Sequence, residues 1–595
     1  MDGFKRQLRL TLILSVVCIA ALIGGFRLRA IRKSNSATAV SSQSGSRQNI
    51  FGTIAATPLP AETAVARDTY VTPAPTSLVA NLSNAQQVTL SSVSGNATAR
   101  AKTLVESNKQ RSAEIVNHIY TTQKGIILTF QGIGSQEELR NVLNVLTETG
   151  SVGTFFVTFE DLEQNADLVS YVASAGHAVG LAVNTGRFLT TEDLLSAIFE
   201  AENTLRTKIG FSGRVCLRQL TGSPSTMLRL AASAGGYTVM SQTRSVVTDA
   251  SVALGTARQI CASIIGNDII GRGEILHFEL GRTSSDLLVG NVIRLIMNSY
   301  TSLPALGIND MMTNTQYVFD YPVDSSAVLS SVKGKIRPGQ LSGDTMSVIE
   351  RRYIGVDWMK TKGYLPGFTD AEIKLLDKTG VIKNDRDMVF LTFDGWGTDE
   401  RVEAILDVLK KHSIKATFFV RTGDAAKNPG LLREIGLAGH TIGSNTHTGF
   451  SLATYKSSAT FLDLTTTQVK ALREDLVKSY DTLVNIVGDL SSGGRPVLST
   501  LFRPYLLAAS KSGLETVFGC GYTYSVSGYF TFEYSGIKSP ENFVSTLNQK
   551  IKSGQIYNFH LDEMPEYMPG ALDSYLTKME GQRKQYRFVS LAEVL

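Results

Sequence analysis

Three residues that can handle protons or carry charge stand at the ends of separate apolar runs in the C-terminal third of the chain. Asp394 follows MVFLTF, Arg503 follows LF, and His560 ends IYNFH. Short runs of this kind, rich in β-branched and aromatic residues, predict buried strands. Because α/β barrels place reacting groups at the carboxyl ends of parallel strands, we expect the three side chains to converge. An acid, a cation and an imidazole together indicate general acid–base chemistry.

The elements that must position these side chains alternate along the chain from about residue 113. Segments 125–130, 153–157 and 177–183 are apolar and short, which predicts strands. Segments 135–150 and 191–210 repeat apolar residues with a helical period, which predicts amphipathic helices. Strands that alternate with helices favour a parallel sheet with helical crossovers, so the fold class is α/β.

An internal repeat divides this α/β region into two copies. At one constant offset, ILTF, TFFV and a Gly-His-x-x-Gly segment of the first copy recur as FLTF, TFFV and Gly-His-x-x-Gly in the second. At slightly larger offsets, Arg218 matches Arg503, and Leu276-His277-Phe278 is paired with Asn558-Phe559-His560. A constant register through helices and loops indicates a duplicated domain of about 200 residues.

The ordered motifs of the second copy resemble those of the NodB-homology polysaccharide deacetylases, carbohydrate esterase family 4. That family carries T-F-D-D, H-[ST]-x-x-H, an arginine–proline segment and L-x-H in this order. The corresponding segments here are 392–395, 445–449, 503–504 and 558–560. The resemblance covers about 385–595 and, more weakly, about 120–300. It implies two tandem distorted (β/α) barrels of the NodB type.

The family's chemistry, carried over by this resemblance, is metal-assisted hydrolysis of an N-acetyl amide. Asp394 would be the general base, Arg503 its partner and His560 the general acid. The metal ligands do not carry over, because the sequence has Gly395, Asn445 and Gly449 at the positions of the metal-binding Asp and the two His. We therefore expect no metal cofactor. Zinc or another divalent ion would bind only if other residues, with His447 as the best candidate, rebuilt a site.

The first copy has lost more of the motif. Gln131 and Gly132 replace the two Asp, and Ala182 and Gly186 replace the two His, whereas Arg218 and His277 remain. We expect this copy to be structural or a binding module. The shared Gly-His-x-x-Gly turn, with His440 in the second copy, indicates a structural, hydrogen-bonded histidine.

Two classes of function fit the second copy, and a third ranks last. It is either a deacetylase of N-acetylated surface glycan, such as peptidoglycan or a chitin-like polymer, with impaired or lost activity, or a silent glycan-binding scaffold. Metal-free hydrolysis by Asp394 and His560 would forgo Lewis-acid stabilisation. The retained Asp394–Arg503 pair is also compatible with a purely structural ion pair. For a sugar-binding groove we predict Trp396, Asn445, His447, Pro504 and Tyr505.

The N-terminus predicts a membrane anchor. Residues 10–26 are almost continuously apolar with basic residues on both sides, and no A-x-A cleavage site precedes the arginines. By analogy with the family, we expect a single-pass plasma-membrane protein with its N-terminus inside and its domains extracellular. The expected division is a cytoplasmic stub (1–9), a transmembrane anchor (10–26), a flexible Ser/Thr/Pro-rich spacer (27–112), a degenerate NodB-like domain (113–310), a connector (311–384) and a NodB-like polysaccharide deacetylase domain (385–595).

The amino-acid composition indicates which classes of binding partner to expect. A net charge of +5 on 595 residues, without a dense basic stripe, argues against a nucleic-acid partner. The four cysteines are far apart in sequence and form neither a disulfide framework nor a CxxC metal site. The expected partners are therefore a cell-surface glycan and the membrane.

Overall fold

A computed structural model describes residues 97–595, apart from 267–269, 357–361, 458–459, 533–535 and 581–585. The described chain falls into two compact units, one ending at Phe319 and one beginning at Asp320. The predicted stub and anchor and most of the predicted spacer lie outside the described residues. Within them, no helix is both long and apolar enough to cross a bilayer.

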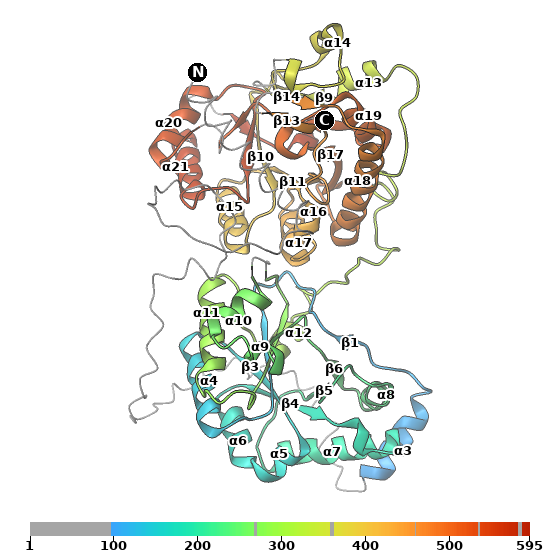
Figure 1. The fold of residues 1–595 in the computed structure, drawn as a ribbon, viewed down its shortest axis with the longest axis vertical. Helices are drawn as coiled ribbons and strands as arrows, with labels where there is room; N and C mark the ends of the chain where they lie inside the picture. The colour runs from blue at the N-terminus through green and yellow to red at the C-terminus, as the bar shows by residue number, and fades with distance from the viewer. Residues whose placement is uncertain (1–96, 267–269, 357–361, 458–459, 533–535, 581–585) are drawn as a thin grey trace, which may run out of the picture. The chain divides into compact units, whose positions relative to one another are not determined.

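The first unit is built on an eight-stranded sheet in which every pairing is parallel (Figure 1). The strand order is β1-β6-β5-β4-β3-β2-β8-β7. Its strands are β1 (Ile115–Val116), β2 (Ile127–Gln131), β3 (Gly153–Val157), β4 (Ala178–Val183), β5 (Cys216–Gln219), β6 (Thr238–Met240), β7 (Arg244–Val247) and β8 (Ile275–Glu279).

Helices surround this sheet and close its core. Ser135 caps α4 by accepting a hydrogen bond from the Glu138 N–H, and the buried face of α4 includes Leu139, Val142 and Leu143. The helical segments are α3 (Ala97–Ser107), α4 (Gln136–Glu148), α5 (Phe159–Gln164), α6 (Ala166–Ser174), the 3-10 turn η3 (Thr185–Arg187), α7 (Thr191–Thr207), α8 (Thr226–Gly235), α9 (Asp249–Val252), α10 (Ala257–Ile264), α11 (Leu288–Ser299) and α12 (Ile308–Thr313).

The structure differs from the expected spacer at its C-terminal end. Residues 97–107 form helix α3, which packs against α7 and α8. Ala101 on this helix is fully buried, and the Arg100 guanidinium lies 4.3 Å from the centre of the Phe199 ring. Alanine and long side chains that pack well on a helix explain why this segment joins the domain.

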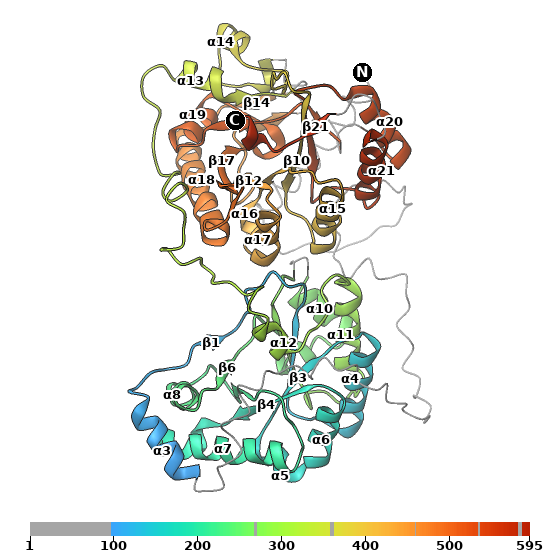
Figure 2. The same ribbon diagram turned by 180° about the vertical axis from the view of Figure 1, so that it is seen from behind.

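The second unit has the same architecture (Figure 2, yellow to red). Its main sheet runs β19-β20-β10-β11-β12-β17-β18-β9, all parallel, and β21 pairs with β10. The strands are β9 (Tyr353–Ile354), β10 (Met388–Gly395), β11 (Thr417–Val420), β12 (Thr441–Ser444), β17 (Leu498–Phe502), β18 (Tyr524–Val526), β19 (Phe530–Thr531), β20 (Ile556–His560) and β21 (Arg587–Phe588), with two small hairpins, β13 (Thr454–Ser457) with β14 (Thr460–Leu462) and β15 (Ser491–Ser492) with β16 (Arg495–Pro496).

Helices again lie between successive strands and outside the sheet (Figures 1 and 2). The helical segments are α13 (Thr345–Arg352), η4 (Lys362–Tyr364), α14 (Asp370–Leu375), α15 (Asp399–Lys411), α16 (Thr422–Ala425), α17 (Pro429–Leu437), α18 (Thr466–Val487), η5 (Tyr505–Leu507), α19 (Lys511–Gly519), α20 (Pro540–Lys550), α21 (Met568–Glu580) and η7 (Leu591–Glu593). The segment predicted as a connector supplies β9, which pairs with β18.

The two sheets share one strand order. Read from one edge, β1-β6-β5-β4-β3-β2-β8-β7 corresponds position by position to β9-β18-β17-β12-β11-β10-β20-β19. Within the described residues, the two edge strands of each sheet do not pair with each other. Both units are therefore open, half-barrel sheets of the parallel α/β class, in agreement with the predicted fold class.

Candidate functional site

The three residues predicted to converge do so at one edge of the second sheet. Asp394 lies near the end of β10 and pairs in register with His560, the last residue of β20. Arg503 directly follows β17, and its backbone N–H donates to the Ser444 carbonyl at the end of β12. The exposed fractions are 2% for Asp394, 0% for Arg503 and 8% for His560, so the group is almost fully removed from water.

Asp394 stands between the other two side chains. Its Oδ1 lies 2.7 Å from His560 Nδ1, and its Oδ2 lies 3.8 Å from Arg503 Nη1. The contact with Arg503 is an ion pair, whereas the contact with His560 is one only when the imidazole is protonated. Arg503 is also fixed by a 3.0 Å hydrogen bond from Nε to the Val526 carbonyl, and its guanidinium lies 4.3 Å from the centre of the Phe419 ring.

The electrostatics favour a charged Asp394. Burial alone would raise the pKa of its carboxyl, but His560 and Arg503 outweigh burial and leave the pKa below its usual value. Burial lowers the pKa of Arg503 to about 10, with Asp394 acting in the opposite direction. Asp394 is therefore an anion and Arg503 a cation at neutral pH.

A small pocket opens beside this group. Its volume is about 20 Å³, close to the space that a single water molecule needs. It is lined by Asp394, Gly395, Arg421, Asn445, Tyr505, Leu506, His560, Asp562 and Glu563. Besides Asp394, three predicted site residues line this pocket: Asn445, Tyr505 and His560.

The residues at the family's metal positions do not fit a metal ion. Gly395 and Gly449 have no side-chain donor and adopt positive φ angles of 81° and 79°. Asn445 uses its amide to donate a 3.0 Å hydrogen bond to the Arg503 carbonyl. Among the residues that the structure describes, no group of three or more His, Cys, Asp or Glu side chains is arranged to hold a metal.

The other predicted substrate-binding residues lie in different surroundings. Trp396 is only 2% exposed, so its ring face is not accessible for stacking on a sugar, and Pro504 is also buried. Tyr505 is half-buried and lines the pocket. His447 is half-buried too, with Nδ1 3.0 Å from Thr422 Oγ1, and its backbone N–H donates to Asp475.

Three charged residues that line the pocket were not predicted as site residues: Arg421, Asp562 and Glu563. Arg421 follows β11, and its Nη1 lies 2.9 Å from Asp562 Oδ2. Arg421 belongs to none of the family motifs quoted above, and one of its two carboxylate partners, Asp562, is 141 residues away. Its position after a TFFV strand is the only local signal that could have drawn attention to it.

In the first unit, amides replace the acid. Gln131 occupies the end of β2, where β10 has Asp394, and its Oε1 accepts a 3.3 Å hydrogen bond from Arg218 Nε. Arg218 Nη2 donates to Gln242 Oε1. Within the described residues, no carboxylate lies within ion-pair distance of Arg218. Burial lowers the pKa of Arg218 to about 10, and the Glu279 carboxylate acts in the opposite direction without an ion-pair contact.

The pairing of His277 with His560 was wrong. In the first sheet, His277 pairs with Thr129 and Glu279 pairs with Gln131. In the second sheet, the equivalent pairs are Asn558 with Thr392 and His560 with Asp394. His277 Nδ1 accordingly contacts Thr129 Oγ1 at 3.0 Å. His277 thus lies two residues before the position of His560, on the same face of its strand. The first unit therefore has a glutamate at the position of His560.

The histidine of the Gly-His-x-x-Gly turn has the predicted structural role. Nδ1 of His440 accepts a hydrogen bond of 3.2 Å from the Ala416 N–H, and Nδ1 of His177 accepts one of 3.2 Å from the Gly153 N–H. Burial lowers the pKa of His440 to about 3 and that of His177 to about 4. Both rings are therefore neutral acceptors that fix the start of the neighbouring strand.

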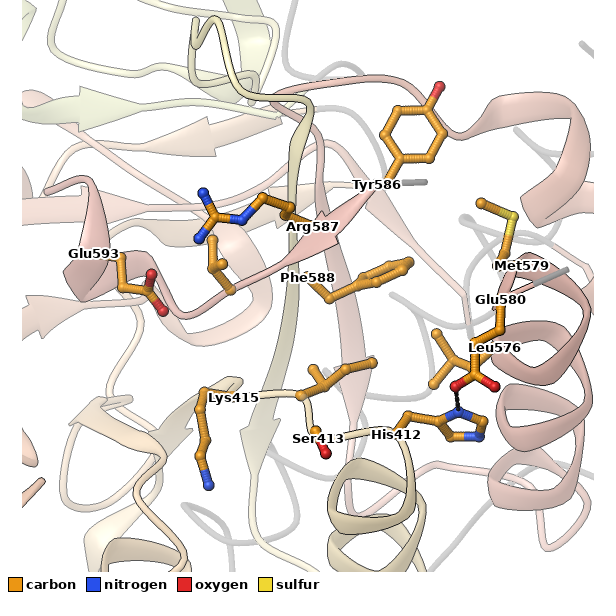
Figure 3. Close-up of a pocket in the computed structure, with 12 residues that line it drawn as sticks. His412, Ser413, Lys415, Leu576, Met579, Glu580, Tyr586, Arg587, Phe588 and Glu593 are labelled. Carbon is orange, nitrogen blue, oxygen red and sulfur yellow. Dashed lines mark hydrogen bonds and ion pairs between the residues drawn. The ribbon is translucent and has the colours of Figure 1, made fainter. Parts of the chain in front are cut away.

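A larger pocket of about 400 Å³ lies at the other end of the same strands. Lys415 precedes β11, whereas Arg421 follows it, so this pocket is separate from the Asp394 group. Figure 3 shows His412 next to Glu580 on one side and Arg587 and Phe588 of β21 on another. His412 Nδ1 lies 2.6 Å from Glu580 Oε1, and Nε2 lies 2.7 Å from Asp573 Oδ1.

Known proteins resemble part of this chain. A family model for polysaccharide deacetylases matches residues 382–517. The peptidoglycan-N-acetylglucosamine deacetylase PgdA of Listeria monocytogenes is 36% identical over 84 residues, which is 14% of this chain and 17% of the relative. The peptidoglycan-N-acetylmuramic acid deacetylase PdaA of Bacillus subtilis is 26% identical over 209 residues, 35% of this chain and 71% of the relative.

Two solved structures are similar as well. Bacillus subtilis PdaA is 21% identical, with 45% of this chain and 94% of that chain covered and a TM-score of 0.30. A CE4 family pseudoenzyme from Bacillus anthracis is 19% identical, with 36% and 66% covered and a TM-score of 0.29. The chain spans about a sixth of the Listeria enzyme. Residues 382–517 are thus the part of the chain that matches the polysaccharide deacetylase family model.

Proposed function

We propose that this chain is a membrane-anchored, outward-facing protein whose deacetylase-family domain binds N-acetylated cell-surface glycan and does not hydrolyse it by the family's metal-assisted route. Peptidoglycan or a chitin-like polymer is the proposed ligand class. The first unit, with the same strand order, is proposed as a divergent second copy that serves as a structural or binding module. The anchor at residues 10–26 and the outside location of both units belong to the proposal.

One observation carries it: the Asp394, Arg503 and His560 group is intact, with Asp394 and His560 lining a pocket, while the positions of the metal ligands hold two glycines and an asparagine engaged with the backbone. Polar groups around a space of about 20 Å³ support binding of one polar atom of a ligand, such as the carbonyl oxygen of an N-acetyl group. The missing ligands remove the Lewis acid on which the family's hydrolysis depends.

The electrostatics of Asp394 further disfavour hydrolysis. A general base works best when its pKa lies near the operating pH. Asp394 has a pKa below the usual range of a carboxyl, because His560 and Arg503 stabilise its charge. Such an anion is a weak base, so binding is favoured over metal-free hydrolysis by Asp394 and His560.

The test measures binding and acetate release on the same purified full-length chain. We expect a tetramer of N-acetylglucosamine to bind in calorimetry and no acetate to be released above the background of buffer. Protease added to intact cells should cleave the units, because they are proposed to lie outside.

Two results would reject the proposal. Acetate release that Asp394→Asn abolishes would establish an active hydrolase instead. Absence of binding to both peptidoglycan fragments and chitin oligomers would remove the glycan ligand. A glycan that binds equally well after Tyr505→Ala and His560→Gln would bind elsewhere than in this pocket.

A further inference from the structure

Arg421 brings a fixed positive charge to the pocket beside Asp394. It follows the last residue of β11, and its backbone N–H donates to the Gly395 carbonyl at 3.1 Å. Its side chain is 8% exposed and lines the pocket together with Asp394 and His560. The cation therefore stands next to the position where the family has its metal-binding aspartate.

Two carboxylates hold this guanidinium in place. Arg421 Nε lies 2.6 Å from Asp424 Oδ2, and Nη1 lies 2.9 Å from Asp562 Oδ2. Asp562 is itself fixed, because its backbone carbonyl accepts a 2.9 Å hydrogen bond from Arg401. Within the described residues, Arg421 Nη2 makes no hydrogen bond, so one donor of the guanidinium remains available to a ligand.

The charge of Arg421 is permanent. Burial alone would lower the pKa of its guanidinium, but Asp562 and Asp424 outweigh burial, so the pKa lies above its usual value. A buried cation that is held by two carboxylates keeps its orientation, and charge-assisted hydrogen bonds from such a group are strong.

Asp562 also fills the space of a metal ligand. A Cβ atom added at Gly395 would lie 2.9 Å from Asp562 Oδ1 and 3.3 Å from its Cγ. At the second glycine, Gly449, a Cβ would lie 3.3 Å from the ring of Tyr505. A side chain added at either glycine would therefore press against a neighbouring side chain.

We propose that Arg421 is the resident cation of this pocket: it donates from its guanidinium to the carbonyl oxygen of a bound N-acetyl group, and together with Asp562 it excludes a divalent metal. The hydrogen bond to the N-acetyl group rests on the proposed function, because it assumes an N-acetylated glycan as the ligand. The exclusion of a divalent metal depends only on the chain and a metal ion. A guanidinium repels a divalent ion placed beside it, and Asp562 blocks an acid at position 395.

The metal half is tested with zinc alone. The variant with Gly395→Asp, Asn445→His and Gly449→His restores the ligand types, and a second variant adds Arg421→Ala and Asp562→Ala. After dialysis against Zn²⁺, emission spectrometry should find no stoichiometric zinc in the first variant and about one equivalent in the second. One equivalent in the first variant, or none in a second variant that circular dichroism shows to be folded, would overturn the exclusion of metal.

Binding of the N-acetyl group by Arg421 is tested with single substitutions in the otherwise unaltered chain. This test does not depend on the folding of variants that carry several substitutions. Arg421→Gln should weaken binding of an N-acetylglucosamine tetramer at least about tenfold, a loss that corresponds to one charge-assisted hydrogen bond. Arg421→Lys should retain part of the affinity, because the charge remains. For the fully deacetylated glucosamine tetramer, the affinities of the wild type and of these variants should differ less.

Arg433→Gln is the matched control. Arg433 pairs with Asp489 at 2.5 Å in the same unit, is 12% exposed and does not line the pocket. Equal loss in Arg433→Gln, or unchanged affinity in Arg421→Gln, would overturn the role of Arg421 in binding. If the wild type binds neither tetramer, the proposed glycan ligand and this half fail together, whereas the zinc experiment still decides the metal half.

Discussion

At the scale of single residues, Asp394 stabilises the fold as well as the pocket. Its carboxylate is the only one within ion-pair distance of Arg503 in the described chain, and both side chains are buried. Asp394→Asn keeps the size but removes the charge, and breaking a buried pair in this way costs about 3–5 kcal/mol. Chemical denaturation of the second unit at pH 7 should detect this loss.

Asp489→Asn is the comparison, because it removes the partner of the more exposed Arg433 and should cost less. The effect of Asp394→Asn should also depend on pH. Since the folded-state pKa of Asp394 is lowered, its contribution is present above the ordinary aspartate pKa of about 3.9 and is lost as the pH falls through the folded value. A loss that is equal at pH 7 and in strong acid would contradict an ionic origin.

The two turn histidines predict a second pH dependence. A histidine with a lowered folded-state pKa stabilises the protein above about pH 6.5, and the stability falls as the pH decreases toward the folded value. For His440 this window extends down to about 3, and for His177 down to about 4. Each should contribute a slope of up to about 1.4 kcal/mol per pH unit in the free energy of unfolding. Denaturation between pH 7 and 4 measures it.

His440→Gln and His177→Gln should each reduce that slope for their own unit, at some cost in stability at pH 7 from the altered hydrogen bond. His447→Gln is a comparison, because burial also lowers the pKa of the half-buried His447, so this variant should reduce the slope of the second unit as well. Slopes that persist in both turn variants would assign the titration to other groups.

At the scale of elements, the close approach of neighbouring strands depends on one glycine in each unit. A Cβ at Gly443 of β12 would lie 2.8 Å from the Leu501 carbonyl of β17, and a Cβ at Gly180 of β4 would lie 2.8 Å from the Cys216 carbonyl of β5. Backbone carbonyls in a sheet cannot move aside easily. Gly443→Ala and Gly180→Ala should each destabilise their unit by about 1–3 kcal/mol in denaturant titrations.

Gly570→Ala is the control for the replacement of glycine by alanine at a position where the added methyl group meets no steric obstacle. Gly570 lies in helix α21, and a Cβ there would meet no atom within 4 Å. Alanine should therefore stabilise by about 0.5–1 kcal/mol. Destabilisation of similar size at all three positions would contradict the steric explanation.

Several elements could be predicted from the sequence because local patterns determine them. The strand expected at 153–157 is β3, and the helix expected at 135–150 contains α4. The convergence of Asp394 with His560 was also predictable, because parallel strands end at one edge. The register of His277 was not, because a three-residue motif without a fixed spacing can slide along its strand, and only pairing with β2 fixes it.

Tertiary contacts explain the remaining differences. Trp396 follows the Asp394 strand and was expected to meet sugar, yet the ring is buried. Arg421 and Asp562 meet only because β11 and the segment after β20 lie on either side of β10. Such pairs carry no local sequence signal.

At the scale of the whole molecule, each unit has its own hydrophobic core. Among the described residues, the buried clusters around Phe130 and Ile127 belong to the first unit, and the one around Phe390 belongs to the second. We expect two separable transitions in calorimetry. Gly180→Ala should lower only one midpoint and Gly443→Ala only the other; a joint shift in both variants would show that the units unfold as one.

The shared strand order has a consequence for biosynthesis. The last four residues of β3 and the whole of β11 have the same sequence, Thr-Phe-Phe-Val, and each strand lies between strands of equivalent position in its own sheet. In a newly made chain, β3 and β11 could therefore each pair in the sheet of the other, and such exchange is a characteristic misassembly of repeated domains. The ribosome resolves the ambiguity by order of emergence: all strands of the first sheet leave it before β10 and β11 exist, so the earlier copy can finish before a competitor appears.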